Sequence, residues 1–298
     1  MNKKKLKFEI ILPTLLLTLS LSCGMFSDSD NTSRENQNSL SIIIVSSDIS
    51  KGLTPIKFAV LNLNGNPILD KEKTLKGLVS PLESPELEKP FTIEWESWPV
   101  SGGVYKTKID FQTSGYWKII ISYEEPENLL GEAIFDVKEK PQTPEIGIIP
   151  LRIHTKTFLD KSLIDNISSD PNPNLNMYKF DFYDVLGIKP IVINFSTPSF
   201  CKSGTCSPVL QYIKTLSEEF GNDVIFIHVE IYDNPHEIKK SGNLNIGKIS
   251  DPVKQWNLPS EPWTFLIDIS GKIASKHESF IDYEELRQRT YKLTQPNQ

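Results

Sequence analysis

The sequence lacks several patterns on which common functions depend. It contains no glycine-rich phosphate-binding loop, no zinc-ligand spacing and no internal repeat. The formal net charge of the 298 residues is −6, and removal of the first 22 residues, which carry +3, would lower it to −9. Because an acidic chain has no general attraction for a phosphate backbone, these features argue against nucleic-acid binding.

Cysteine is also scarce: the chain has three, and two of them lie together. Residues 191–195 form an apolar, β-branched and aromatic run typical of a buried parallel strand, and Cys201 follows it. After Cys206 the apolar residues follow helical spacing, and Gly221 is a candidate stop. The pair therefore lies at a predicted strand-to-helix junction, where the N–H groups and dipole of a helix start lower a thiol pKa. The apolar face of this helix comprises Val209, Leu210, Tyr212, Ile213, Leu216 and Phe220.

The spacing of the pair is Cys-x4-Cys. Five steps along a regular helix would separate the two Cα atoms by roughly 8 Å, beyond the limit of roughly 7 Å for a disulfide. Residues 202–205 must therefore form a loop if the pair is to close, and Gly204 supplies the backbone freedom. Thr205 or Ser207 is expected to cap the helix, with Pro208 in its first turn. The alternatives to a redox-active dithiol are a static disulfide and two buried thiols.

The remainder of the C-terminal half continues the alternation of strands and helices. Residues 166–187 are rich in proline and asparagine and then weakly helical. Further strands are expected at 223–232, 263–269 and 272–277, with a last helix from Asp282 through Tyr291. Two segments in this order resemble the thioredoxin-like superfamily. They are Phe195-Ser-Thr-Pro-Ser-Phe-Cys201 with Cys206-Ser-Pro, and Ser260-Glu-Pro262-Trp-Thr-Phe-Leu-Ile-Asp. Within it, the chain is similar to a group of extracytoplasmic proteins that carry Cys-x4-Cys in place of Cys-x-x-Cys.

The resemblance implies an α/β thioredoxin-like domain over residues 166–298 that exchanges thiols and disulfides with partner proteins and needs no cofactor. It makes Pro262 a cis-proline that faces the dithiol and helps to hold the substrate backbone. It makes Cys201 the attacking cysteine and Cys206 the resolving one, although Cys206 lies nearer the helix start and the roles could be reversed. Glu230 and Asp268 are candidates for assisting proton transfer to a thiol.

A hypothesis of a different class makes the protein a non-catalytic binding or copper-delivery protein. Cys201 and Cys206 would then bind a soft metal such as Cu(I) together with His228 or His277. This resembles the copper-delivery branch of the superfamily, but that branch carries Cys-x3-Cys-Pro, one residue shorter. We expect no metal here and a buried or hydrogen-bonded His228. The histidines expected at the surface are His154, His236 and His277.

The N-terminus predicts export and anchoring. A lysine-rich start precedes the apolar residues 10–21, and Ser20-Leu-Ser-Cys23-Gly resembles the lipobox of bacterial lipoproteins. Residues 1–23 are therefore expected to be a lipoprotein signal peptide with a lipidated Cys23, and the polar residues 24–39 a flexible tether. The alternatives are an uncleaved or conventionally cleaved secretory segment and a cytosolic protein. A lipoprotein or a secreted protein would lie outside the cytoplasm, where disulfides persist.

Residues 40–138 are expected to form an immunoglobulin-like β-sandwich, joined to the second domain by a proline-stiffened linker at 139–165. Several candidate strands alternate polar with apolar residues between glycine-containing turns. Similar modules occur on extracytoplasmic proteins, some linked to copper handling, but their histidine and methionine ligands are missing here. A spacer or protein-docking role is the better hypothesis. The expected strands are 41–45, 56–63, 91–96, 104–111, 116–123 and 132–137, and the expected core residues are Trp95, Phe111, Trp117 and Phe135.

Overall fold

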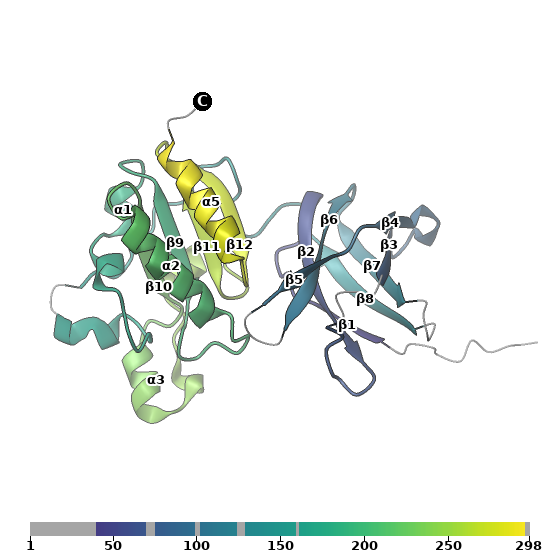
Figure 1. The fold of residues 1–298 in the computed structure, drawn as a ribbon, viewed down its shortest axis with the longest axis horizontal. Coiled ribbons are helices and arrows are strands. Elements are labelled where there is room, and N and C mark those ends of the chain that lie inside the picture. The colour runs from purple at the N-terminus through teal and green to yellow at the C-terminus, as the bar shows by residue number, and fades with distance from the viewer. Residues whose placement is uncertain (1–39, 70–74, 99–101, 124–128, 159–160, 296–298) are drawn as a thin grey trace, which may run out of the picture. The chain divides into compact units, whose positions relative to one another are not determined.

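A computed structural model describes residues 40–69, 75–98, 102–123, 129–158 and 161–295 (Figure 1). The proposed signal peptide, Cys23 and the tether lie outside these residues. The described chain contains a β-rich region, residues 40–137, followed by an α/β region that begins near residue 161. None of the helices described is long and apolar enough to span a membrane.

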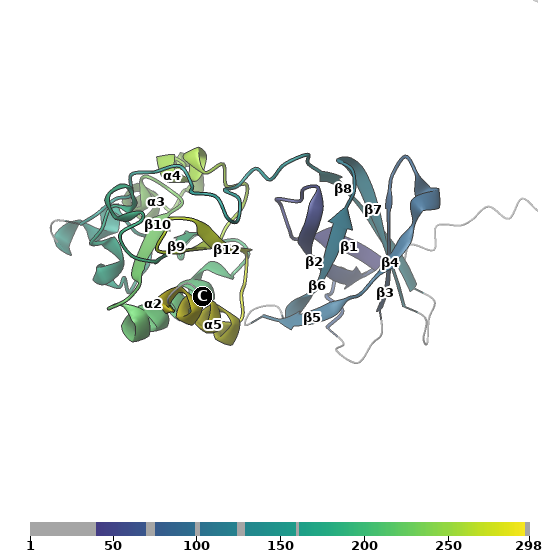
Figure 2. The same cartoon turned by 90° about the horizontal axis from the view of Figure 1, so that it is seen from above.

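The β-rich region consists of two antiparallel sheets of four strands each (Figure 2). The first has the order β1-β2-β6-β5 and the second the order β4-β3-β7-β8. Alternating residues of the long strands are buried, and Phe111, Trp117 and Phe135 belong to the common core as predicted, whereas Trp95 is only partly buried. The strands are β1 (Leu40–Ile44), β2 (Gly52–Asn62), β3 (Leu75–Pro81), β4 (Lys89–Phe91), β5 (Glu94–Ser97), β6 (Gly103–Phe111), β7 (Gly115–Tyr123) and β8 (Leu129–Val137), with η1 (Pro85–Leu87) between β3 and β4.

The α/β region is built on a mixed sheet of order β10-β9-β11-β12. Strand β9 (Ile191–Ser196) is central; β10 (Ile225–Glu230) pairs with it in parallel, and β11 (Trp263–Ile267) pairs with it antiparallel. Strand β12 (Ile273–Glu278) pairs antiparallel with β11. Every residue of β9, β10 and β11 is buried, which explains the continuous apolar runs in the sequence.

Two apolar layers cover the faces of this sheet. Helices α2 (Cys206–Phe220) and α5 (Tyr283–Thr294) pack on one face, where Val192 joins their core. Phe195 and Phe265 point to the other face and pack against Trp256, which follows α4. The helical face predicted for α2 is buried, except that Tyr212 is partly exposed. The shorter helical elements are η2 (Lys161–Asn166), η3 (Leu175–Tyr178), α1 (Phe182–Val185), α3 (Pro235–Ser241), η4 (Leu244–Ile246) and α4 (Asp251–Gln255).

The predicted linker is fastened at several points. Asp48 accepts hydrogen bonds from the N–H groups of Gln142 and Thr143 at 2.8 and 3.1 Å, and it forms an ion pair with Lys276 of β12 at 3.4 Å. Gly147 donates its N–H to the carbonyl of Ile273, and Ile273 donates to the carbonyl of Ile148. The linker thus pairs with the first residue of β12. The described residues from 40 onward belong to one compact unit, and separate folding of the β-rich and α/β regions stays a prediction.

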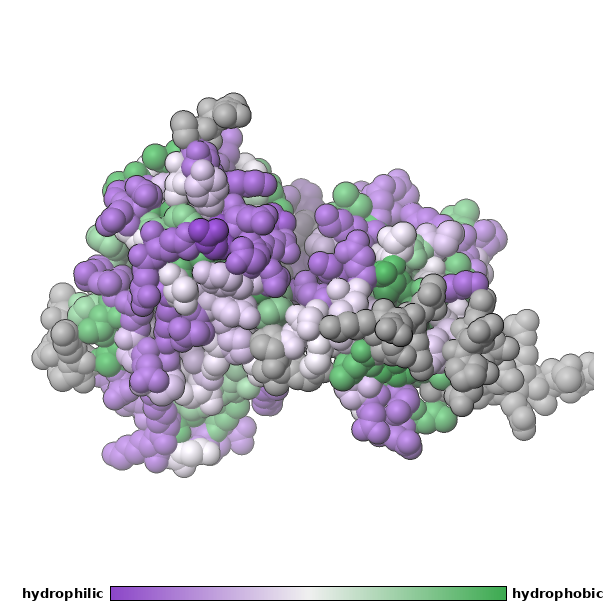
Figure 3. Space-filling model, in the orientation of Figure 1, coloured by the Kyte–Doolittle hydropathy of each residue, from purple (hydrophilic) through white to green (hydrophobic). Residues whose placement is uncertain are grey.

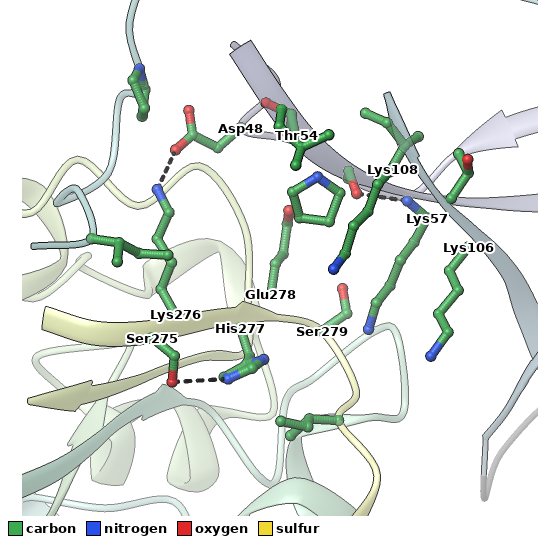
Figure 4. Close-up of a pocket in the computed structure, with 18 of the residues that line it drawn as sticks. Asp48, Thr54, Lys57, Lys106, Lys108, Ser275, Lys276, His277, Glu278 and Ser279 are labelled. Carbon is green, nitrogen blue, oxygen red and sulfur yellow. Dashed lines mark hydrogen bonds and ion pairs between the residues drawn. The ribbon is translucent and has the colours of Figure 1, made fainter. Parts of the chain in front are cut away.

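The exposed surface in the view of Figure 3 is predominantly hydrophilic, with hydrophobic residues scattered among the charged ones. A cavity of about 800 Å³ is lined by residues of β2, β6 and β12 (Figure 4). Its charged side chains are largely paired: Lys57 lies 2.8 Å from Glu96, and Lys276 contacts Asp48. Because positive and negative groups offset each other there, this cavity does not favour an ion of either sign.

Candidate redox site

Cys201 and Cys206 form a disulfide, and their Cα atoms are 6.1 Å apart. The separation lies within the limit of roughly 7 Å because the four residues between them form a loop, with Gly204 at a φ of +71° as its position in the sequence suggests. Cys206 is the first residue of α2 and is fully buried, whereas Cys201 is partly exposed. Only the Cys201 sulfur is therefore open to a partner protein.

The loop is held by short-range hydrogen bonds. Cys201 donates its N–H to the Thr197 carbonyl, and its Sγ lies 3.2 Å from the Ser203 hydroxyl. Thr205 occupies the N-cap position, as one of the two alternatives expected, but its side chain accepts no N–H from the first turn. It contacts Ser203 instead, at 2.8 Å, and Ser207 donates to the Pro198 carbonyl. No capping side chain thus competes with the cysteine sulfur for the N–H groups of the helix start.

A carboxyl group that the sequence analysis missed lies beside the buried sulfur. Glu261 Oε2 is 3.6 Å from Cys206 Sγ and accepts the Thr197 N–H at 2.9 Å. Burial, helped by the negative charge of Glu230, raises the pKa of Glu261 to about 7. The signal that could have identified Glu261 in the sequence was its position directly before Pro262, which the resemblance already placed opposite the dithiol. The Glu261–Pro262 peptide bond is cis.

Of the two carboxyl groups named from the sequence, Glu230 belongs to this site. It ends β10, is buried, and accepts the Ser169 N–H at 2.7 Å. Within the described part of the chain its Oε1 has no hydrogen-bond partner, and burial raises the pKa of Glu230. Asp268 instead closes the turn between β11 and β12, where its Oδ1 accepts N–H groups from Ser270 and Lys272.

The histidines do not join the dithiol. His228 is buried on β10, paired with Asn194 in the ladder, and its ring contacts the Tyr178 hydroxyl at 2.7 Å and the Ser196 hydroxyl at 3.0 Å. Burial lowers the pKa of His228 to about 4, so its ring is neutral at neutral pH. His277 on β12 is partly buried, contrary to the expectation of a surface position, and contacts Ser275. The two exposed histidines are His154 and His236.

The donor atoms that converge here in the described part of the chain come from Cys201, Cys206 and Glu261, all within 4.8 Å of one another. In the disulfide form neither sulfur is a thiolate, so this group is not a metal centre in the state observed. The combination of two cysteines with His228 or His277, proposed from the sequence for Cu(I), does not converge in the same way. The chemistry that the site supports directly is therefore that of the sulfur pair.

The strand order and the disulfide at the start of α2 give the α/β region the thioredoxin-like fold that the resemblance predicts. A putative thiol:disulfide interchange protein DsbE from Chlorobium tepidum is similar, at 18% identity and a TM-score of 0.32 over 39% of this chain and 86% of its own. So is the exposed lipoprotein thioredoxin of Streptococcus pneumoniae, at 21% identity and a TM-score of 0.30 over 38% and 90%.

A filamin domain of Lin-41 is similar at 11% identity and a TM-score of 0.23, over 33% of this chain and 93% of its own. No family model and no curated protein sequence matches the chain. The likenesses are partial, and the function proposed below rests on the residues of this chain.

Proposed function

We propose that the protein is a thiol–disulfide oxidoreductase whose Cys201–Cys206 pair exchanges with protein thiols or disulfides. The observation that carries this proposal is the asymmetry of the pair at the start of α2. Cys201 is partly exposed, whereas Cys206 is fully buried beside a carboxyl group. A static structural disulfide needs neither an exposed sulfur nor a proton acceptor, whereas an exchange reaction uses both.

In the oxidising direction, the thiolate of a substrate attacks Cys201 Sγ, breaks the Cys201–Cys206 bond and leaves Cys206 as a thiolate that takes up a proton. A second substrate thiolate then attacks the substrate sulfur of the mixed disulfide and releases Cys201 as a thiolate. The substrate loses two electrons and the protein gains them. In the reducing direction Cys201 attacks first, and Cys206 resolves the mixed disulfide. Pro262, next to Glu261, is proposed to hold the substrate backbone.

We further propose that the protein acts outside the cytoplasm, anchored to a membrane by a lipid on Cys23. The support is the Ser20-Leu-Ser-Cys23 sequence, the polar segment after it and the use of the other two cysteines as a disulfide. In this arrangement residues 40–138 form a β-sandwich domain that serves as a spacer or docking module, and residues 166–298 form the redox domain.

The test of the redox function is the reactivity of the pair. In the reduced protein, Cys201 should be alkylated at mildly acidic pH, because the helix start lowers a thiol pKa below its usual value of about 8.5. The reduction potential should lie above the roughly −300 mV typical of structural disulfides. Cys206→Ser should trap substrate proteins as mixed disulfides, and Cys201→Ser, the matched control, should trap far fewer.

Two outcomes would contradict this function. A pair that resists glutathione-range buffers, with neither thiol reacting early, would be a structural clip. Stoichiometric Cu(I) binding that is lost in His228→Ala or His277→Ala, without disulfide exchange, would make the protein a metal carrier.

A further inference from the structure

Two carboxyl groups lie in series behind the buried sulfur. Glu261 Oε2 is 3.6 Å from Cys206 Sγ. Thr197, itself fully buried, lies between this carboxyl group and the next: its N–H donates to Glu261, and its hydroxyl lies 3.3 Å from that of Ser169, whose N–H donates to Glu230. Cys206, Glu261, Thr197, Ser169 and Glu230 therefore belong to one buried polar cluster.

Glu230 is the more deeply buried of the two carboxyl groups. It is 5% exposed, whereas Glu261 is partly exposed. The Glu230 Oε1 is closed to solvent and lacks any hydrogen-bond partner among the described residues. A buried carboxyl oxygen without a partner is costly unless it is protonated. This agrees with the pKa of Glu230, which burial raises.

We propose that Glu261 is the proton acceptor and donor for Cys206, and that the charge of Glu230 behind it controls how readily Glu261 holds the proton. The proposal rests on the redox function above and adds a residue role to it. When Cys206 resolves a mixed disulfide, its S–H proton moves to Glu261 as the sulfur attacks Cys201. The Cys201–substrate bond breaks, and the substrate leaves as a thiolate with the bonding electron pair. The proton then leaves Glu261, which is partly exposed, directly to solvent.

The charges around the two carboxyl groups suit this role. The groups that face Glu261 are the two cysteines, Glu230 and the hydroxyl of Tyr232. Those around Glu230 include Tyr178 and His228 as well. Burial raises the pKa of both tyrosines and lowers that of His228, so these three are uncharged at neutral pH. Glu261 is then the group that exchanges protons near neutrality, and the negative charge of Glu230 raises its pKa by repulsion.

The test is a single-turnover measurement with Ellman's reagent as the probe. Attack by Cys201 on this aromatic disulfide releases one coloured thionitrobenzoate anion, and resolution by Cys206 releases a second. The rate of the second release, followed from about pH 4 to pH 9, should rise near neutrality, where Glu261 ionises. Glu261→Gln should slow it about 10- to 100-fold at neutral pH, the lower part of what a positioned general base contributes. In that variant the rate should rise only as the thiol itself ionises, at about pH 8.5.

Three further variants complete the experiment. Glu261→Asp should restore the rise near neutrality. Glu230→Gln should move that rise to lower pH, because the repelling charge is gone. Glu218→Gln, an exposed glutamate on the same helix as Cys206, should behave as the wild-type protein. The rate of the first release should be unchanged in every variant, which shows that the site is intact.

Each possible result bears on the proposal in a defined way. Wild-type rates and an unshifted pH profile in Glu261→Gln would overturn the role of Glu261 while leaving the redox function standing. An unshifted profile in Glu230→Gln would overturn the influence of Glu230 on Glu261. Absence of the second release in the wild-type protein would remove both the role of Glu261 and the proposed function.

Discussion

The residue with the largest consequence in this structure is Glu261, a glutamate that the sequence distinguishes only by its place directly before Pro262. Its carboxyl group contacts a cysteine 55 positions earlier in the chain. That contact exists because β11 pairs with β9, which carries the dithiol loop at its end. The pairing brings the residues before β11 to the same edge as Thr197. Propensity and periodicity describe neighbours within an element, so they identified Cys201, Cys206 and Gly204 but not the glutamate beside them.

Glu261 should also affect stability with pH. Its pKa is raised from an ordinary 4.5 to about 7, so the folded protein prefers the protonated form more than the unfolded chain does. A raised carboxyl pKa stabilises the fold fully below pH 4.5 and loses that contribution as the pH rises to about 7. For the oxidised protein, the contribution of Glu261 to the free energy of unfolding should fall by at most about 3 kcal/mol over this pH range.

The change in the free energy of unfolding between pH 5 and pH 8, measured with urea for the oxidised wild-type protein and for Glu261→Gln, isolates this contribution. The comparison is needed because burial lowers the pKa of His228 to about 4 and that of His277 to about 3, so both histidines favour the folded state more as the pH rises. Glu261→Gln should therefore lose less stability, or gain more, than the wild-type protein between pH 5 and pH 8. Asp48 does not interfere, because despite its burial the hydrogen bonds from Gln142 and Thr143, with Lys276, lower its pKa. Its contribution is therefore lost only in more acidic solution. A slope that survives unchanged in Glu261→Gln would show that other groups set it.

At the scale of elements, the sequence was most informative where one periodicity holds without interruption. The apolar run at 191–195 predicted β9, because a strand buried on both faces is apolar at every position. The helical spacing after Cys206 predicted α2, because a helix buried along one stripe repeats its apolar residues every three to four positions. Strand β3 was not predicted. It contains Gly77 and ends in Pro81, both poor strand residues, and Gly77 is needed because a Cβ there would lie 2.4 Å from the Phe91 ring. The short helices α3 and α4 were missed because five to seven residues show too little periodicity.

The protection of the linker against proteolysis can be tested. We expect limited proteolysis to cut between about residues 138 and 174 and to leave a redox-competent C-terminal fragment. Because Asp48 binds Gln142, Thr143 and Lys276, Asp48→Ala should expose the linker and speed the cut several-fold. Mass spectrometry of the fragments and gel densitometry over time measure both effects. Asp136→Ala, an exposed acid on β8, is a suitable control. A C-terminal fragment that cannot fold without residues 40–138 would show that the two regions form one cooperative unit.

For the whole molecule, the proposed anchor determines where the redox chemistry takes place. Cys23→Ala should abolish acylation and release the protein from membranes, because a lipid on the new N-terminal cysteine is the attachment that the lipobox-like sequence predicts. Membrane fractionation and mass spectrometry of the mature N-terminus measure the two effects. Cys201→Ser, which leaves the N-terminus intact, should stay in the membrane fraction. An unmodified mature N-terminus at another position of the wild-type protein would refute the anchor.

The hydrogen bonds between the linker and Ile273 have a consequence for solubility. Strand β12 is the last strand of its sheet, and an open sheet edge is a template on which a second chain can add a strand. Gly147 and Ile148 occupy part of that edge from within the same chain. The linker therefore covers the start of this edge, and we expect a fragment that begins after Pro150 to be more prone to aggregate while keeping its cysteines unchanged.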